Sequence, residues 1–374
     1  LSQSNTDNLL KILQIFGGCV MTTLFLCLKP KLVILNKLAG NFIQKNIFLM
    51  ICLPDKIPGM LQGCLITLHG CRRHVRTGQL DTFIIMLTEN LKQSTLYGGI
   101  LTLETIQNTV GRNGYLLYFQ FTLNDYVSEG FEPNVPSVTQ RVETFRELSE
   151  MIGKERVIWR FDPLIITPSI TPRVLLSRIW KIGNQLKGYT DKLVFSFVDV
   201  KAYRKVQNNL IKETNCFTKE DVETAEMNAM QRQETVEGLV KLREIWASTG
   251  WNVTLATCAE DIDLTVYGIE HNRCIDGDLM ERVFEEDYEL VYYLRTGQLP
   301  EPDLFGTFPA LPDKRKDLKD KGQRKACGCM ISKDIGRYNT CRHFCVYCYA
   351  NTSRECVQKN AVHYSDDSES LIRS

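Results

Sequence analysis

From residue 114 onward, short apolar runs alternate with longer amphipathic segments. Nearly continuous apolar runs are typical of strands buried on both faces, and their alternation with helical periodicity is typical of βα units around a parallel sheet. The predicted strands are residues 115–123, 156–164, 192–200 and 251–260. We therefore expect an α/β fold, and we interpret it as a TIM-barrel-like (β/α) domain whose first strands could be missing from this chain.

The amphipathic segments between these strands carry helix start and stop signals. Ser137 is suited to cap a helix that ends at Gly153. Thr171 and Pro172 are suited to open a second helix that runs to Gly188, because proline is favoured at the first helical position. A third, longer helix is predicted over residues 219–248.

Polar residues stand at the end of every predicted strand. In α/β sheets and barrels, ligands bind at the carboxyl ends of the strands, so we expect a site there. The candidate catalytic residues lining its pocket are Gln120, Arg160, Asp162 and Glu260. A structural interpretation stays open, because an Asp before Pro often belongs to a turn and Arg160 can form a plain ion pair with Asp162.

Pattern and charge divide the chain into four regions. Residues 1–113 have poor periodicity and contain 11 Lys and Arg but only 5 Asp and Glu. Residues 114–283 form the α/β core, residues 284–325 a charged, proline-containing linker, and residues 326–374 a cysteine-rich region with a tail. The scarcity of acidic residues and the lack of an initiating Met motivate the hypothesis that residues 1–113 are out of frame or incomplete. The alternative is a divergent region.

Overall composition excludes some classes of function. Across 374 residues, 45 Lys and Arg balance 44 Asp and Glu, which gives no electrostatic reason to expect nucleic acid or an anionic membrane as a partner. The most apolar stretch, residues 15–28, is shorter than the roughly 20 residues that span a bilayer. We expect a cytoplasmic protein that acts on a small molecule or another substrate yet to be identified.

Cysteine is unusually abundant, with 14 Cys against 5 His. So many thiols are unexpected in a cytosolic enzyme unless some of them hold a metal. Cys341, Cys345 and Cys348 follow a C-x3-C-x2-C spacing, with the aromatic Tyr347 before the last thiol. Three thiolates in one loop can bind three irons of a 4Fe-4S cluster and leave the fourth iron open.

Four further cysteines form a second candidate set of metal ligands, and they are Cys258, Cys274, Cys327 and Cys329. Four thiolates would complete the coordination of a second iron–sulfur cluster or of a structural zinc ion. Buried free thiols are an equally good interpretation. The remaining seven cysteines show no ligand spacing, and we expect His343 to form a hydrogen bond near the cluster loop rather than to bind a metal.

The spacing of Cys341, Cys345 and Cys348, with Tyr347, resembles the signature of radical S-adenosylmethionine (SAM) enzymes. The resemblance implies that the open iron binds SAM, that the reduced cluster cleaves SAM to a 5′-deoxyadenosyl radical, and that Tyr347 packs near the adenine. It also implies an electron donor such as flavodoxin or ferredoxin. The order along the chain differs, because this signature usually follows the first strand and here it follows the α/β region.

Longer motifs resemble a bacterial family known as domain of unknown function 1848, over about residues 114–351. These motifs are Glu132-Pro-Asn134, Val157-Ile-Trp-Arg-Phe-Asp-Pro163, Thr257-Cys-Ala-Glu260, Gly268-Ile-Glu-His-Asn-Arg-Cys-Ile-Asp276 and Cys345-Val-Tyr-Cys348-Tyr-Ala-Asn351. The family is uncharacterised, but its C-terminal cysteines are themselves similar to radical-SAM ligands. Its usual N-terminal motifs are not found in this chain beyond Asp55-Lys-Ile-Pro58.

Two functions from different classes follow. The first is a radical-SAM-like iron–sulfur enzyme of unknown substrate. The second is a zinc-stabilised binding or scaffold protein that uses the same cysteines. The metal and sulfide content of anaerobically purified protein separates the two.

Overall fold

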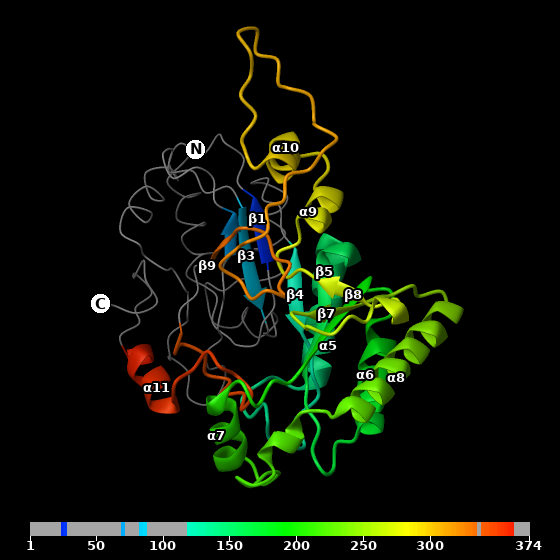
Figure 1. The fold of residues 1–374 in the computed structure, drawn as a ribbon, viewed down its shortest axis with the longest axis vertical. Helices are drawn as coiled ribbons and strands as arrows, with labels where there is room; N and C mark the ends of the chain where they lie inside the picture. Colours follow the sequence, from blue (N-terminus) through cyan, green and yellow to red (C-terminus); the bar gives the residue numbers. More distant parts are fainter. Residues whose placement is uncertain (1–23, 28–68, 72–81, 88–117, 335–337, 363–374) are drawn as a thin grey trace.

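The computed structural model describes residues 24–27, 69–71, 82–87, 118–334 and 338–362 (Figure 1). Its strands are β1 (Leu24–Cys27), β2 (His69–Cys71), β3 (Thr82–Leu87), β4 (Phe119–Thr122), β5 (Val157–Leu164), β6 (Lys192–Phe197), β7 (Thr254–Cys258), β8 (Glu270–Asn272) and β9 (Lys333–Asp334). They form one sheet in the order β8-β7-β6-β5-β4-β3-β2-β9, and β1 pairs with β3. Most of the predicted N-terminal region 1–113 lies outside the described residues.

The parallel part of the sheet runs from β3 to β8, since each of these strands pairs in parallel with its neighbour. The strands β1, β2 and β9 pair antiparallel at the other end. The predicted α/β class and the parallel sheet are therefore confirmed. Closure of this sheet into a barrel stays a prediction.

Alternation along the strands separates two cores on opposite faces of the sheet, because successive side chains of a strand point to opposite faces. One core contains Phe119, Trp159 and Phe195 from β4, β5 and β6. The second contains Ile158 and Val194 from the same strands. This burial on both faces explains why the strands are nearly continuous apolar runs.

Helices cover both faces. They are α5 (Val138–Ile152), α6 (Pro172–Leu186), α7 (Arg204–Glu213), α8 (Ala229–Ser248), α9 (Gly277–Val283), α10 (Tyr288–Thr296) and α11 (Arg354–Val362). The buried sides of α5, α6 and α8 join the first core, and those of α9 and α10 join the second. Figure 1 shows α6 and α8 packed side by side.

The helix signals in the sequence are confirmed at two of three places. Ser137 accepts a hydrogen bond from the backbone of Gln140 at the start of α5, and Gly153 is the C-terminal cap of this helix. Thr171 caps α6, with Pro172 in its first turn. The prediction of one helix over residues 219–248 is wrong, because α8 begins only at Ala229, where Asn228 forms a new N-terminal cap.

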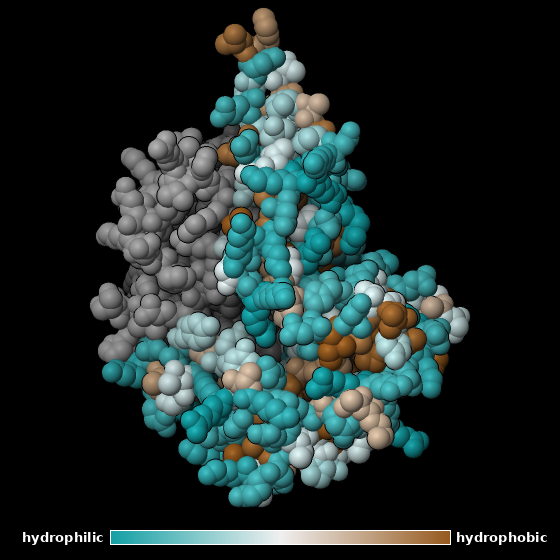
Figure 2. All heavy atoms as spheres, in the orientation of Figure 1, coloured by the Kyte–Doolittle hydropathy of each residue, from teal (hydrophilic) through white to brown (hydrophobic). Residues whose placement is uncertain are grey.

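The region expected to be a linker, residues 284–325, contains α10 and then an extended arm (Figure 1). At the tip of the arm, Leu304 and Phe305 are almost fully exposed, and hydrophobic side chains are seen there in Figure 2. Among the helices that the structure describes, none combines the length and the apolar character needed to cross a membrane.

Candidate functional site

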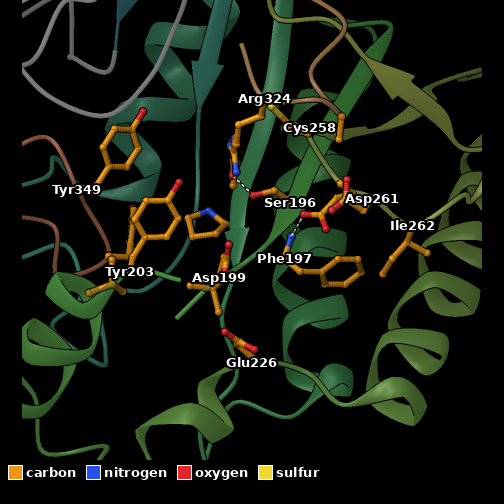
Figure 3. A pocket seen from close by; sticks show the side chains of 18 of the residues that line it. Ser196, Phe197, Asp199, Tyr203, Glu226, Cys258, Asp261, Ile262, Arg324 and Tyr349 are labelled. Carbon is orange, nitrogen blue, oxygen red and sulfur yellow. Dashed lines mark hydrogen bonds between the residues drawn. The ribbon is translucent and has the colours of Figure 1, made fainter. Parts of the chain in front are cut away.

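A pocket of about 580 Å³ lies at the carboxyl ends of β5, β6 and β7 (Figure 3). Strand-end residues form one wall, and they include Asp162, Ser196, Asp199, Cys258 and Glu260. Residues 347–350 of the cysteine loop and residues 324–326 complete the enclosure. The structure therefore places a pocket where the sequence predicted one.

Arg160 lies buried beneath this pocket and organises its floor. Its guanidinium donates to Gln120 Oε1 at 2.5 Å, to Asp162 Oδ2 at 3.1 Å and to Cys274 Sγ at 3.0 Å. Ser196 donates its hydroxyl to the other oxygen of Asp162. The ion pair between Arg160 and Asp162 is thus present, and Asp162 also faces the pocket. A structural and a functional role are compatible here.

Glu260 is the carboxylate whose protonation the pocket affects most clearly. Its Oε1 accepts a hydrogen bond of 2.8 Å from the backbone of Phe197 (Figure 3). Burial raises the pKa of Glu260 above its ordinary value of 4.5, and the nearby Asp162 adds to the rise. A carboxyl group with a raised pKa is suited to proton transfer.

The cluster loop, residues 341–348, packs against the segment that follows β4. Val346 donates its backbone N–H to Phe131 O at 3.0 Å, and the side chain of Asn134 donates to Arg342 O at 2.7 Å. Tyr347 donates its hydroxyl to the buried carboxylate of Glu132. These contacts hold the loop at the edge of the pocket.

The three cysteines of this loop differ in their surroundings. Cys341 and Cys345 are buried, whereas Cys348 lines the pocket. The sulfur of Cys341 accepts from His343 N and that of Cys348 from Ala350 N, both at 3.4 Å. In this structure Cys341 forms a disulfide, and Cys345 and Cys348 are free thiols.

His343 is buried within the loop, and burial lowers its pKa to about 3, with a smaller effect from Arg141. The imidazole is therefore neutral at physiological pH. Its role as a hydrogen-bonding residue stays a prediction.

The second set of cysteines also converges. Cys258 and Cys274 lie with their sulfur atoms 3.3 Å apart, and Ile275, next to Cys274, donates its backbone N–H to Cys329 Sγ at 3.4 Å. Hydrogen bonds from Cys258 and Cys329, with the positive charge of Arg160, lower the pKa of Cys274 well below its usual value. Within the described ranges, however, no three His, Cys, Asp or Glu side chains are already placed to coordinate one metal ion.

The structure thus brings together most of the residues singled out from the sequence. Asp162, Glu260, Tyr347 and Cys348 line the pocket, and Arg160 lines its floor. Gln120 contacts Arg160 but is absent from the lining.

Several lining residues were not predicted as site residues. Tyr203 stacks on Tyr349 with ring centroids 6.0 Å apart, and Arg324 lies near the pocket wall formed by β6 (Figure 3). The sequence gives little indication of them, because they come from loops rather than strand ends.

Comparison with known proteins yields one family. No curated protein and no solved structure matches the chain. A family model described as a domain of unknown function (DUF1848) matches residues 99–350, which include β4 to β8 and the cluster loop. Because this match covers more than half of the chain, the protein belongs to the DUF1848 family.

Proposed function

We propose that this protein is a radical-SAM-like iron–sulfur enzyme that acts on a small polar molecule in the pocket. The observation that carries the proposal is the position of the cluster loop. Tyr347 and Cys348, from the C-x3-C-x2-C segment, form one wall of a pocket whose other wall consists of strand ends of a parallel sheet. Strand ends of a TIM-barrel-like scaffold are where such chemistry is expected.

The residues of the loop fit an iron–sulfur cluster. Cys341, Cys345 and Cys348 would hold three irons, and two backbone N–H groups already point at the sulfur atoms of Cys341 and Cys348. Hydrogen bonds of this kind stabilise the negative charge of a cluster. Lys205, whose Nζ is buried without a hydrogen-bond partner among the described residues, adds a positive charge near Cys348. The assignment requires Cys341 in its reduced form.

The chemistry that such a cluster supplies when bound is the one-electron reductive cleavage of SAM, with the electron coming from a donor such as flavodoxin or ferredoxin. The chain's own residues would bind and orient the substrate. Arg232 and Arg324 supply positive charge to the pocket, and Asp199 and Glu226 supply negative charge. A lining with both signs favours a zwitterionic or otherwise polar substrate.

Two carboxylates have distinct roles in this proposal. Asp162 is fixed by Arg160 and Ser196, so it would position the substrate. Glu260, with its raised pKa, would accept or donate a proton at its carboxyl group. Tyr347 is anchored by its hydroxyl, so only its ring can contact a bound adenine.

The proposal is tested by anaerobic reconstitution with iron and sulfide. We expect about four irons per chain in the wild type, with the visible absorption and paramagnetic signal of a reduced four-iron cluster. The Cys345→Ala variant should lose most of this iron, because one of three protein ligands is removed. Cys216→Ala, which removes a partly buried free thiol outside the loop, is the matched control.

Two outcomes would contradict the proposal. One is a wild type that binds no iron, and the other is a Cys345→Ala variant with full cluster content. If the wild type holds zinc but no iron or sulfide, and the Cys345→Ala variant loses that zinc, the result would favour the zinc-stabilised scaffold. A loaded wild type should then form 5′-deoxyadenosine from SAM under reduction, and Cys345→Ala should form none.

A further inference from the structure

Four free cysteines from three separate segments meet on the α9 and α10 side of the sheet. Cys258 ends β7, Cys274 follows β8, and Cys327 and Cys329 come from the segment beyond the arm. The sulfur atoms of Cys258 and Cys274 are 3.3 Å apart. Ile275, next to Cys274, donates its backbone N–H to Cys329 Sγ at 3.4 Å, and Cys327 stands two residues before Cys329. All four cysteines therefore lie in or against the same core on this face.

The backbone fixes this group in place. Met330 N donates to Ile275 O at 3.2 Å, which joins the Cys327–Cys329 segment to the chain after β8. Gly328 lies so close to Arg273 that a Cβ atom would be 3.0 Å from its side chain, so the segment packs closely against the chain after β8. The convergence of the sulfur atoms is thus a property of the fold and not of a few flexible side chains.

The surroundings of the group favour thiolates. Arg160 donates from its buried guanidinium to Cys274 Sγ at 3.0 Å, and Ile275 donates its backbone N–H to Cys329 Sγ at 3.4 Å. Both donors are directed at sulfur acceptors. A buried cation in contact with Cys274 offsets part of the negative charge that a four-thiolate metal site carries.

We propose that Cys258, Cys274, Cys327 and Cys329 together bind a single divalent metal ion, zinc, at a closed structural site that is separate from the cluster loop. Zinc–sulfur bonds of about 2.3 Å in a tetrahedron place the sulfur atoms about 3.8 Å apart, close to the 3.3 Å contact between Cys258 and Cys274. A four-iron cluster binds each thiolate to a different iron, so its sulfur ligands do not touch. The spacing therefore selects one ion over a second cluster.

The proposed ion does not occupy a ready-made tetrahedron, because the described side chains include no finished set of metal ligands. Cys258 and Cys274 are in sulfur–sulfur contact, and Cys327 and Cys329 pack in or against the same core. Rotation of the thiols about their own side-chain bonds is the change that would bring the four sulfur atoms around an ion.

This site would secure one wall of the pocket. Residues 324–326 line the pocket immediately before Cys327, and Cys258 lines it directly. Arg160 connects Cys274 to Asp162 on the pocket floor. A metal ion held by the four thiolates would therefore fix both the wall and the floor, as structural zinc sites do elsewhere.

Metal analysis of anaerobically purified, full-length protein tests the proposal. We expect about one zinc per chain in the wild type and less than about a tenth of that in Cys274→Ser and in Cys329→Ser, because a four-thiolate site does not survive loss of a ligand. Cys216→Ser, a change at a free thiol outside the group, should keep its zinc. Zinc retained in both ligand variants, or absent from the wild type, would overturn the proposal.

A measurement on the wild type protects the test against variants that fail to fold. Protein exchanged with Co²⁺ should show the intense visible bands of a tetrahedral four-thiolate site, and a mercurial reagent should release the ion as the thiols react. Cobalt bound without those bands would refute the site. So would a disulfide between Cys258 and Cys274 found by mass spectrometry of anaerobically purified protein.

The two metal proposals fail independently. Cys345→Ala should lose iron and keep zinc, whereas Cys274→Ser should lose zinc and keep the iron bound by the cluster loop. Iron absent from a protein that holds zinc at the four cysteines would contradict only the proposed function. Iron present without zinc would contradict only the zinc site.

Discussion

Tyr347 illustrates how one side chain can join a loop to a core. Its ring lines the pocket, while its hydroxyl reaches Glu132, which is fully buried beside Arg141. Asn124 donates to the same hydroxyl at 3.1 Å. The resemblance to radical-SAM enzymes implies only a contact with adenine for this residue. The structure adds a polar anchor that holds the cluster loop, whatever the loop binds.

Replacing Tyr347 with Phe should lower the free energy of unfolding by about 1–3 kcal/mol, because the buried carboxylate of Glu132 loses a donor while the ring keeps its packing. Denaturant unfolding under anaerobic, reducing conditions measures this. Tyr292→Phe is the control, since the half-buried Tyr292 has no hydroxyl hydrogen bond within the described residues. An equal decrease in the free energy of unfolding of both variants would show that the hydrogen bond to Glu132 adds nothing to stability.

At the scale of elements, local signals in the sequence predict where α5 and α6 begin, because Ser137 and Thr171 act through hydrogen bonds to nearby backbone. The break before α8 was missed. Residues 219–248 have helical periodicity throughout, but Asn228 bonds to the backbone of Gln231 and starts a new helix there. A cap inside an apparently continuous pattern is hard to distinguish from an ordinary polar position.

The cysteine group shows what no local pattern can supply. In the parallel pairing of β7 and β8, Cys258 at the end of β7 lies opposite Asn272 at the end of β8. Cys274 comes two residues after Asn272, so the pairing brings it near Cys258. Cys327 and Cys329 reach the same place only after the arm has returned. Register and chain path decide that meeting, and both depend on long-range packing. The sequence alone therefore left free thiols and a metal site as equal alternatives.

The contact between α6 and α8 depends on a glycine. A Cβ at Gly183 would lie 2.3 Å from Cζ2 of Trp246, whose indole is buried between Trp180 and Trp251. Trp246 also donates its ring N–H to Asn184 at 3.0 Å. The indole is thus held on several sides and has little room to move.

Gly183→Ala should therefore destabilise the protein by about 1–3 kcal/mol through overpacking, even though alanine favours helix by about 1 kcal/mol. The steric effect prevails because Trp246 cannot retreat. Thermal unfolding measures the change, with Ser177→Ala on the exposed side of α6 as the control. A midpoint that stays the same or rises in Gly183→Ala would show that the two helices separate at little cost.

At the scale of the whole molecule, the pocket lies where two metal-ligand candidates approach one another. Cys348 belongs to the cluster loop and Cys258 to the four-cysteine group, and both line the same pocket. The cluster loop packs against the segment after β4, and the four-cysteine group lies on the face of the sheet that α9 and α10 cover. A substrate in the pocket would thus contact parts of the chain that are far apart in sequence, so its binding depends on the complete parallel sheet.

Burial of charge at this pocket should be visible in the stability of the entire fold. Because the pKa of Glu260 is raised above 4.5 in the folded chain, the folded state holds more protons than the unfolded state between pH 4.5 and that higher pKa. The stability that the raised pKa of Glu260 contributes is therefore fully present below pH 4.5. This contribution is lost progressively as the pH rises through the pKa that Glu260 has in the folded chain.

The Glu260→Gln variant should lack this loss, because its amide does not ionise and its Oε1 can still accept the bond from Phe197. We expect the difference between its unfolding midpoint and that of the wild type to rise as the pH is raised from 4.5, and to level off above the pKa of Glu260 in the folded chain. Glu234→Gln, an exposed change on α8, should give a constant difference over the same range. Parallel pH profiles for wild type and Glu260→Gln would mean that the carboxyl group ionises as freely in the pocket as in water, and Glu260 would then be a poor choice for proton transfer.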